Sequence, residues 1–187
     1  MTLIMCESND IILKKYRLYL ESLAKNNSTE VFSNGGKDFA SILMAILFKN
    51  TQNEIRIFCE GFKPDLIMTQ PYFSELKGYL NDGKKELKVL VEDDTYRDME
   101  PLLLLKEEKS KRNNDTILYK KVSETDKELI FKTLGNNHCN FAVFDTNKFR
   151  LEYDPVNYKA FGSFNNPQNC KILIDLFDNA FSNASII

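Results

Sequence analysis

Hydrophobic positions recur along the chain with two periods, and together they predict helices that alternate with strands. Apolar residues three or four positions apart, introduced by a capping residue or a proline, are typical of amphipathic helices. This pattern covers residues 8–25, 37–49, 71–80, 95–111, 123–135 and 167–181. Between these segments, short stretches rich in β-branched and aromatic residues predict strands over residues 30–33, 54–60, 87–91 and 116–122. Pro101 interrupts one helical segment and predicts a break or a new helix start there.

The last third of the chain has a different pattern, in which strand-like stretches follow one another closely. Residues 139–145, 149–154 and 158–164 predict three strands of a meander. Strands alternating with helices, followed by adjacent strands, predict an α/β layered domain with a central mixed β-sheet flanked by helices. The length of 187 residues fits one domain, with residues 1–29 as an N-terminal amphipathic helix extension on a core of residues 30–187.

Charge and composition exclude several classes of function. Lys and Arg total 25 and Asp and Glu total 27, so the net charge is −2 and no overall positive field attracts nucleic acid or an anionic membrane. Any contact with phosphate must therefore be local. No apolar run approaches the roughly 20 residues of a membrane span, and the opening residues lack the pattern of a secretory signal. We expect a cytoplasmic protein without a membrane span.

The four cysteines do not predict a metal site. Cys6, Cys59, Cys139 and Cys170 are widely spaced, no C-x-x-C pair occurs, and the chain has one histidine to help ligate a metal. We therefore expect reduced thiols and no bound metal.

One constellation near the C-terminus carries chemistry. The sole histidine, His138, opens a mostly apolar stretch that ends at Asp145. Because side chains alternate along a strand, His138 and Asn140 are expected to project from the same face. Downstream, the stretch Gly162-Ser163-Phe164-Asn165-Asn166 offers hydroxyl and amide groups that can hydrogen-bond phosphate oxygens, provided that the two strands are neighbours.

This pattern resembles the phospholipase D-like superfamily, whose signature is H-x-K-x-x-x-x-D followed by G-S-x-x-N or a similar stretch. His138 and Asp145 match the histidine and aspartate, whereas Asn140 stands where the family has lysine. Gly162, Ser163 and Asn166 fit the second part of the signature, after a longer gap than usual. The resemblance implies a phospholipase D-like fold. It also implies a chemistry without metal or other cofactor, in which the histidine attacks phosphorus and the aspartate orients the imidazole.

The differences from the signature bear on activity. A single histidine allows only one copy of a motif that the family mechanism uses twice, so catalysis would require a homodimer or a partner protein that supplies the second copy. Loss of the lysine removes a positive charge, and losing one such donor typically costs about 3 to 4 kcal/mol of transition-state stabilisation. Lys159 shares strand parity with Ser163 and could supply a cation to the same pocket.

The leading hypothesis is a degenerate, non-catalytic domain with a binding or regulatory role. It would retain a pocket for phosphate or a nucleic-acid backbone, formed by His138, Asn140, Lys159, Ser163, Asn165 and Asn166. The first alternative is an active homodimeric, metal-independent phosphodiesterase or nuclease with His138 and Asp145 as catalytic residues. The second is a purely structural protein-interaction module. Simpler interpretations of single residues also stand: Asp145 is typical of a turn start, and Asn165 or Asn166 of a helix cap.

Overall fold

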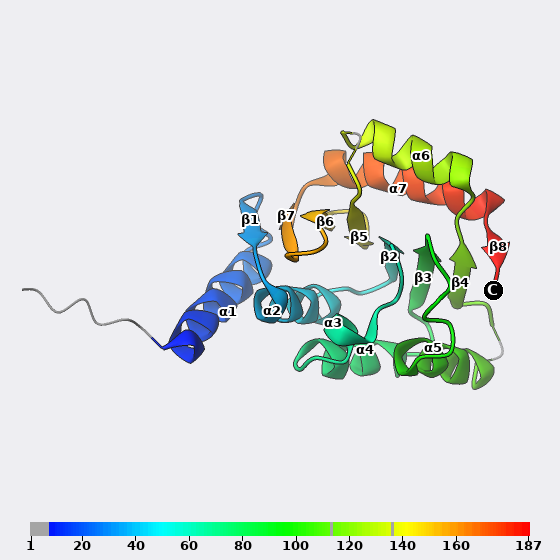
Figure 1. Ribbon diagram of the computed structural model, residues 1–187. Helices are drawn as coiled ribbons and strands as arrows, with labels where there is room; N and C mark the ends of the chain where they lie inside the picture. Colours follow the sequence, from blue (N-terminus) through cyan, green and yellow to red (C-terminus); the bar gives the residue numbers. More distant parts are fainter. Residues whose placement is uncertain (1–7, 113, 136) are drawn as a thin grey trace, which may run out of the picture.

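A mixed β-sheet lies between two layers of helices (Figure 1). The computed structural model describes residues 8–112, 114–135 and 137–187. Over these residues the strand order is β1-β7-β6-β5-β2-β3-β4-β8. The strands are β1 (Val31–Asn34), β2 (Glu54–Cys59), β3 (Glu86–Val91), β4 (Ile117–Lys121), β5 (Asn140–Phe144), β6 (Lys148–Asp154), β7 (Lys159–Ser163) and β8 (Ser185–Ile186). The helices are α1 (Asn9–Lys25), α2 (Lys37–Lys49), α3 (Pro64–Ile67), α4 (Tyr72–Leu80), α5 (Glu100–Ser110), α6 (Glu124–Thr133) and α7 (Pro167–Asn183).

The sheet combines a parallel part with an antiparallel meander. Strands β2, β3 and β4 are parallel, and the chain crosses between them through α4 and α5, because parallel neighbours need a long connection. Strand β5 pairs antiparallel with β2, and β5, β6 and β7 follow one another as antiparallel neighbours. The predicted mixed sheet and its meander are therefore confirmed.

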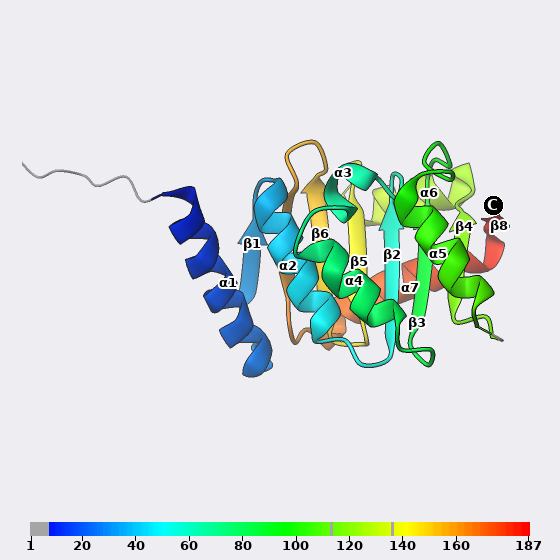
Figure 2. The same cartoon turned by 90° about the horizontal axis from the view of Figure 1, so that it is seen from below.

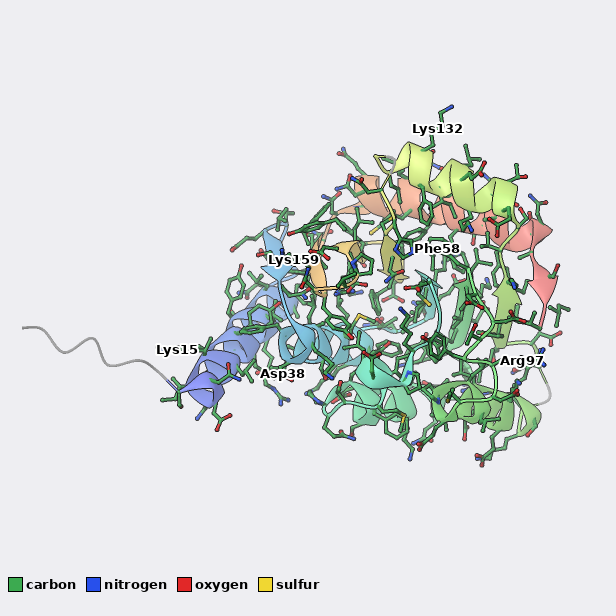
Figure 3. All side chains as sticks on the ribbon, in the orientation of Figure 1. Lys15, Asp38, Phe58, Arg97, Lys132 and Lys159 are labelled. Atoms are coloured by element: carbon green, nitrogen blue, oxygen red, sulfur yellow. The ribbon has the colours of Figure 1, made fainter. Side chains whose placement is uncertain are left out.

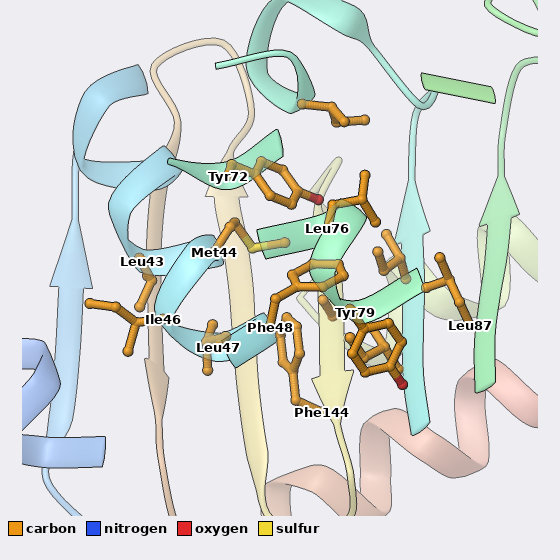
Figure 4. Packing of buried hydrophobic residues seen from close by; sticks show 14 of the residues in the cluster. Leu43, Met44, Ile46, Leu47, Phe48, Tyr72, Leu76, Tyr79, Leu87 and Phe144 are labelled. Atoms are coloured by element: carbon orange, nitrogen blue, oxygen red, sulfur yellow. The ribbon is translucent and has the colours of Figure 1, made fainter. Parts of the chain in front are cut away.

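Each face of the sheet carries its own apolar core. On one face lie α2, α4 and α5, as Figure 2 shows, with the side chains of α2 and α4 interleaved in Figure 4. Helix α2 is buried from Ala40 to Phe48, because it lies between the sheet, α1 and α4. On the other face, α6 and α7 cover a second cluster. Phe58 is fully buried there, against Phe131 of α6 and Phe141 of β5 (Figure 3).

Most predicted elements occur within one or two residues of their expected bounds, and the differences have simple causes. Helix α5 begins at Glu100 with Pro101 in its first turn, which confirms a new start at the proline. Helix α3 and strand β8 were not predicted, because four and two residues are too short to show a period. Ser123 caps α6 through the Asp126 backbone N–H, as expected. Cys6 lies outside the described residues; Cys59, Cys139 and Cys170 are free thiols.

Candidate functional site

A pocket of about 250 Å³ opens where β2 ends. Strand β5 is antiparallel to β2, so its first residues lie at the same edge of the sheet and form another wall. Further walls come from residues 60–63, α3, β6 and the turn between β6 and β7. In open α/β sheets, ligands bind beyond the carboxyl ends of strands, and this pocket has that position.

Asn140 occupies the pocket floor with both ends of its amide engaged. It lies opposite Glu152 in the β5–β6 register. Its Nδ2 donates to Glu152 Oε2 at 2.6 Å, and its Oδ1 accepts from the backbone N–H of Glu60 at 3.0 Å. Asn140, at the lysine position of the signature, thus supplies no charge, and its amide is already hydrogen-bonded to the Glu152 carboxylate.

The buried cation of the pocket is Arg150. It lies two residues from Glu152 on β6, so both side chains project from the same face. The Arg150 Nη2 and Glu152 Oε1 are 2.6 Å apart, with side chains only 6% and 5% exposed. Arg150 Nε donates to Asn34 Oδ1 at 3.3 Å. The pocket floor is therefore an internally neutralised ion pair.

Two further contacts lie at the pocket mouth, and the second of them joins two segments of the chain. Lys63 Nζ and Glu60 Oε2 are 2.5 Å apart, with both side chains more than a third exposed. The Tyr158 hydroxyl, in the β6–β7 turn, donates to Asp65 of α3. Partial burial and this hydrogen bond raise the pKa of Tyr158 to about 12. The phenol therefore stays protonated and keeps donating at neutral pH.

His138 lies outside the pocket. Its Nε2 is 2.9 Å from Glu92 Oε1, just beyond β3, and its ring meets Phe131 of α6 edge-on at 5.4 Å. Burial raises the pKa of Glu92, and the neighbouring imidazole partly offsets that rise. The side chains of His138 and Asn140 have separate partners, since β5 begins only at Asn140 and simple strand alternation does not extend to residue 138.

Asp145 lies at the opposite end of β5 from His138 and does not contact the imidazole; the carboxylate partner of His138 is Glu92. The Asp145 Oδ1 accepts from the backbone N–H of Asn53 at 2.8 Å, and the Asp145 Oδ2 accepts from Lys148 Nζ at 2.8 Å. Asp145 therefore braces the chain just before β2.

The second part of the signature also lies away from the pocket. Ser163 pairs with Phe149, which pairs with Val143, so Ser163 is three residues, or about 10 Å, further along the sheet than Asn140. Its hydroxyl accepts from the backbone N–H of Asn165 at 3.2 Å. Asn166 caps α7 by accepting from the Asn169 backbone N–H at 3.0 Å. These contacts match the simpler interpretation of a helix cap.

Lys159 does not supply the missing cation. Its side chain is 50% exposed and lies 3.3 Å from Asp154 Oδ2. Figure 3 places it beside β1 and β7, and it is absent from the pocket wall. The expectation that Lys159 and Ser163 share one pocket is therefore corrected.

Sequence reasoning missed Arg150, Glu152 and Glu92. The first two carried a signal, because opposite charges two residues apart on a predicted strand share one face. Glu92 carried no such signal, although its side chain is only 11% exposed. Among the residues that the structure describes, no group of three or more His, Cys, Asp or Glu side chains could hold a metal ion, and no helix is long and apolar enough to cross a membrane.

Comparison with known proteins places the fold. No family model and no curated protein sequence matches the chain. Among solved structures, Nuc from Salmonella typhimurium, a phospholipase D family member, is similar over 84% of this chain and 99% of its own, with a TM-score of 0.55 and 10% identity. NucT from Helicobacter pylori is similar over 84% of this chain and 100% of its own, with a TM-score of 0.56 and 8% identity.

A third similar structure is TrmBL2, an archaeal chromatin protein whose structure shows a novel mode of DNA binding. The similarity covers 95% of this chain, with a TM-score of 0.58 and 12% identity, and this chain spans 63% of that protein's length. Together with the sheet order and the two helical layers, these similarities define a layered α/β domain with a mixed sheet. More specifically, the chain has a phospholipase D-like fold.

Proposed function

We propose that this chain is a binding domain of phospholipase D-like fold that does not hydrolyse phosphodiesters, and that the pocket around Asn140 is its ligand site. The observation that carries the proposal is that His138 contacts Glu92 and Phe131 of α6, whereas Asn140, which lines the pocket, bonds Glu152 and the Glu60 backbone. Nucleophilic attack requires the reacting atoms to be about 3 to 3.5 Å apart. A ligand in the pocket would instead meet Asn140, Arg150 and Glu152.

The electrostatics of the pocket support the same proposal. The lysine position holds Asn140, whose amide is already bonded to the Glu152 carboxylate. A phosphate placed there would face that carboxylate without the charge that the family lysine provides. The cost of losing such a donor is about 3 to 4 kcal/mol in the barrier, which lowers the rate 10²- to 10³-fold. In this proposal, ligand binding in the pocket has a regulatory role in place of catalysis.

The proposal is tested by hydrolysis of bis-para-nitrophenyl phosphate and single-stranded DNA in the presence of chelator. Wild type and His138→Ala are compared at matched concentration, after the oligomeric state of each has been measured by light scattering. We expect no turnover above buffer for either protein. Metal-independent turnover that disappears in His138→Ala would overturn the proposal.

One observation favours a second candidate, an active homodimeric phosphodiesterase. His138 is 42% exposed and already hydrogen-bonded to a carboxylate, which is the pairing that orients an imidazole for nucleophilic or general-base chemistry. A second copy of the chain would have to place its own His138 opposite. If this candidate is correct, Glu92→Gln should lower turnover as well, whereas Asp145→Asn should act only through stability, because Asp145 does not contact the imidazole.

A further inference from the structure

Two hydrogen-bonding groups on the pocket wall have no protein partner among the described residues. The first is the Tyr72 hydroxyl. Tyr72 is only 2% exposed and its ring lies 5.4 Å from that of Phe48. The hydrogen bond that the structure gives this residue involves its backbone N–H and Ser41 Oγ. Figure 4 shows the Tyr72 ring next to Met44, between the helical layer and the sheet, and both residues line the pocket.

The second group is Nη1 of Arg150. A guanidinium has five N–H donors, and the described residues accept from Nε and Nη2 through Asn34 and Glu152. Burial raises the pKa of the Tyr72 hydroxyl well above its ordinary value, although nearby Arg150 acts against this rise. Tyr72 is therefore a protonated donor at neutral pH. The Tyr72 hydroxyl and Arg150 Nη1 are therefore two donors on the pocket wall that a hydrogen-bond acceptor of a ligand would satisfy.

The charges around the pocket disfavour an anion as that acceptor. On the floor, the charge of Arg150 is neutralised by Glu152. At the mouth, Lys63 pairs with Glu60, and Asp65 adds a further carboxylate. Three carboxylates thus face two cations, so a phosphate or carboxylate ligand would enter against a net negative charge. An uncharged acceptor meets no such cost.

The remaining wall is mostly apolar. It is contributed by α2, β2, the 60–63 segment, α3, α4 and β5, through Met44, Ile57, Phe62, Ile67, Tyr72 and Ala142. A volume of about 250 Å³ fits a compact ligand. Burying apolar ligand surface against these side chains would supply most of the binding free energy, with few polar contacts to fix orientation.

We infer that the pocket binds a compact, uncharged molecule with an apolar body and one carbonyl oxygen, which accepts hydrogen bonds from the Tyr72 hydroxyl and Arg150 Nη1. This inference rests on the proposed function, because it names the ligand class of the same site. It differs from the phosphate pocket expected from the signature, whose residues the structure disperses.

The experiment measures binding of three probes by protein-observed NMR titration: ε-caprolactam as the uncharged carbonyl, cyclohexanecarboxylate as an anion of similar size, and inorganic phosphate. Tyr72→Phe removes the hydroxyl and leaves the ring. Tyr119→Phe is the control, because the Tyr119 hydroxyl is buried without a hydrogen-bond partner among the described residues and does not line the pocket. Neither variant breaks a hydrogen bond between described residues, so both should melt at or above the wild-type temperature.

We expect caprolactam to bind in the millimolar range and to perturb pocket residues. Its affinity should fall about fivefold in Tyr72→Phe, because one neutral hydrogen bond is lost, and stay unchanged in Tyr119→Phe. Tighter binding of cyclohexanecarboxylate or phosphate than of caprolactam would overturn the inference and leave the proposed binding pocket standing. Absence of caprolactam binding to a folded wild type would also overturn it. His138-dependent phosphodiester turnover would instead overturn the proposed function.

Discussion

The carboxylate of Asp145 accepts hydrogen bonds from donors in two segments of the chain. The Asn53 and Gln52 backbone N–H groups lie before β2, and Lys148 lies at the start of β6. Burial alone would raise the pKa of Asp145, but the hydrogen bonds outweigh burial and lower it. A residue that the sequence pattern assigned to catalysis thus holds together the ends of β2, β5 and β6.

This lowered pKa predicts a pH-dependent contribution to stability. A carboxyl group with a lower pKa in the folded state stabilises the protein fully above its unfolded-state value of about 4, and that contribution is lost as pH falls through the folded value. Asp145→Asn should lower the free energy of unfolding by about 1 to 3 kcal/mol at pH 7. The difference from wild type should shrink as pH falls from 5 to 3, measured by urea unfolding.

The control for this prediction is Asp115→Asn, because the Asp115 side chain is 83% exposed. That variant should stay within about 0.5 kcal/mol of wild type. A gap between Asp145→Asn and wild type that stays constant from pH 7 to pH 3 would contradict the account.

At the scale of elements, hydrophobic period was enough to predict nearly all helices and strands, but not how strands lie side by side. Local patterns such as the stripe of α7 or the alternation in β1 depend on neighbouring residues. The position of Ser163 relative to Asn140 depends instead on pairing across β5, β6 and β7, which residues far apart in sequence determine. The signature therefore predicted the fold correctly, while it grouped residues that the register separates.

Strand β6 carries the ion pair that this register places under Asn140, and its energetics can be tested. Arg150→Met leaves Glu152 as a buried carboxylate without its cation, so we expect a loss of about 3 to 5 kcal/mol. Adding Glu152→Gln removes that charge and keeps an acceptor for Asn140, and should recover more than half of the loss. Asn34 Oδ1 loses the Arg150 donor with or without the second substitution, while Asn34 Nδ2 still donates to the Tyr158 carbonyl. Urea unfolding of both single variants and the double variant yields the coupling energy, and additive effects would contradict a direct pair.

At the scale of the whole molecule, the question is whether the N-terminal helix is an appendage or part of the core. Figure 1 shows α1 at the margin of the molecule beside α2 and β1. Its inner face is nevertheless integrated: Leu20 is fully buried, and the Tyr16 ring meets Phe39 of α2 at 5.0 Å. By contrast, Leu18 on the same helix is 57% exposed. Burial on one stripe only is what an amphipathic helix packed on a larger core shows.

Leu20 and Leu18 make a matched pair, because both are leucines of α1 that are replaced by alanine and only their burial differs. Leu20→Ala should lower the free energy of unfolding by about 2 to 5 kcal/mol, from lost apolar contact and the cavity left behind. Leu18→Ala should change it by no more than about 0.5 kcal/mol. If thermal unfolding of Leu20→Ala remains a single transition at a lower temperature, α1 unfolds with the sheet. A separate early transition, or equal effects of the two substitutions, would instead make residues 1–29 an independent extension.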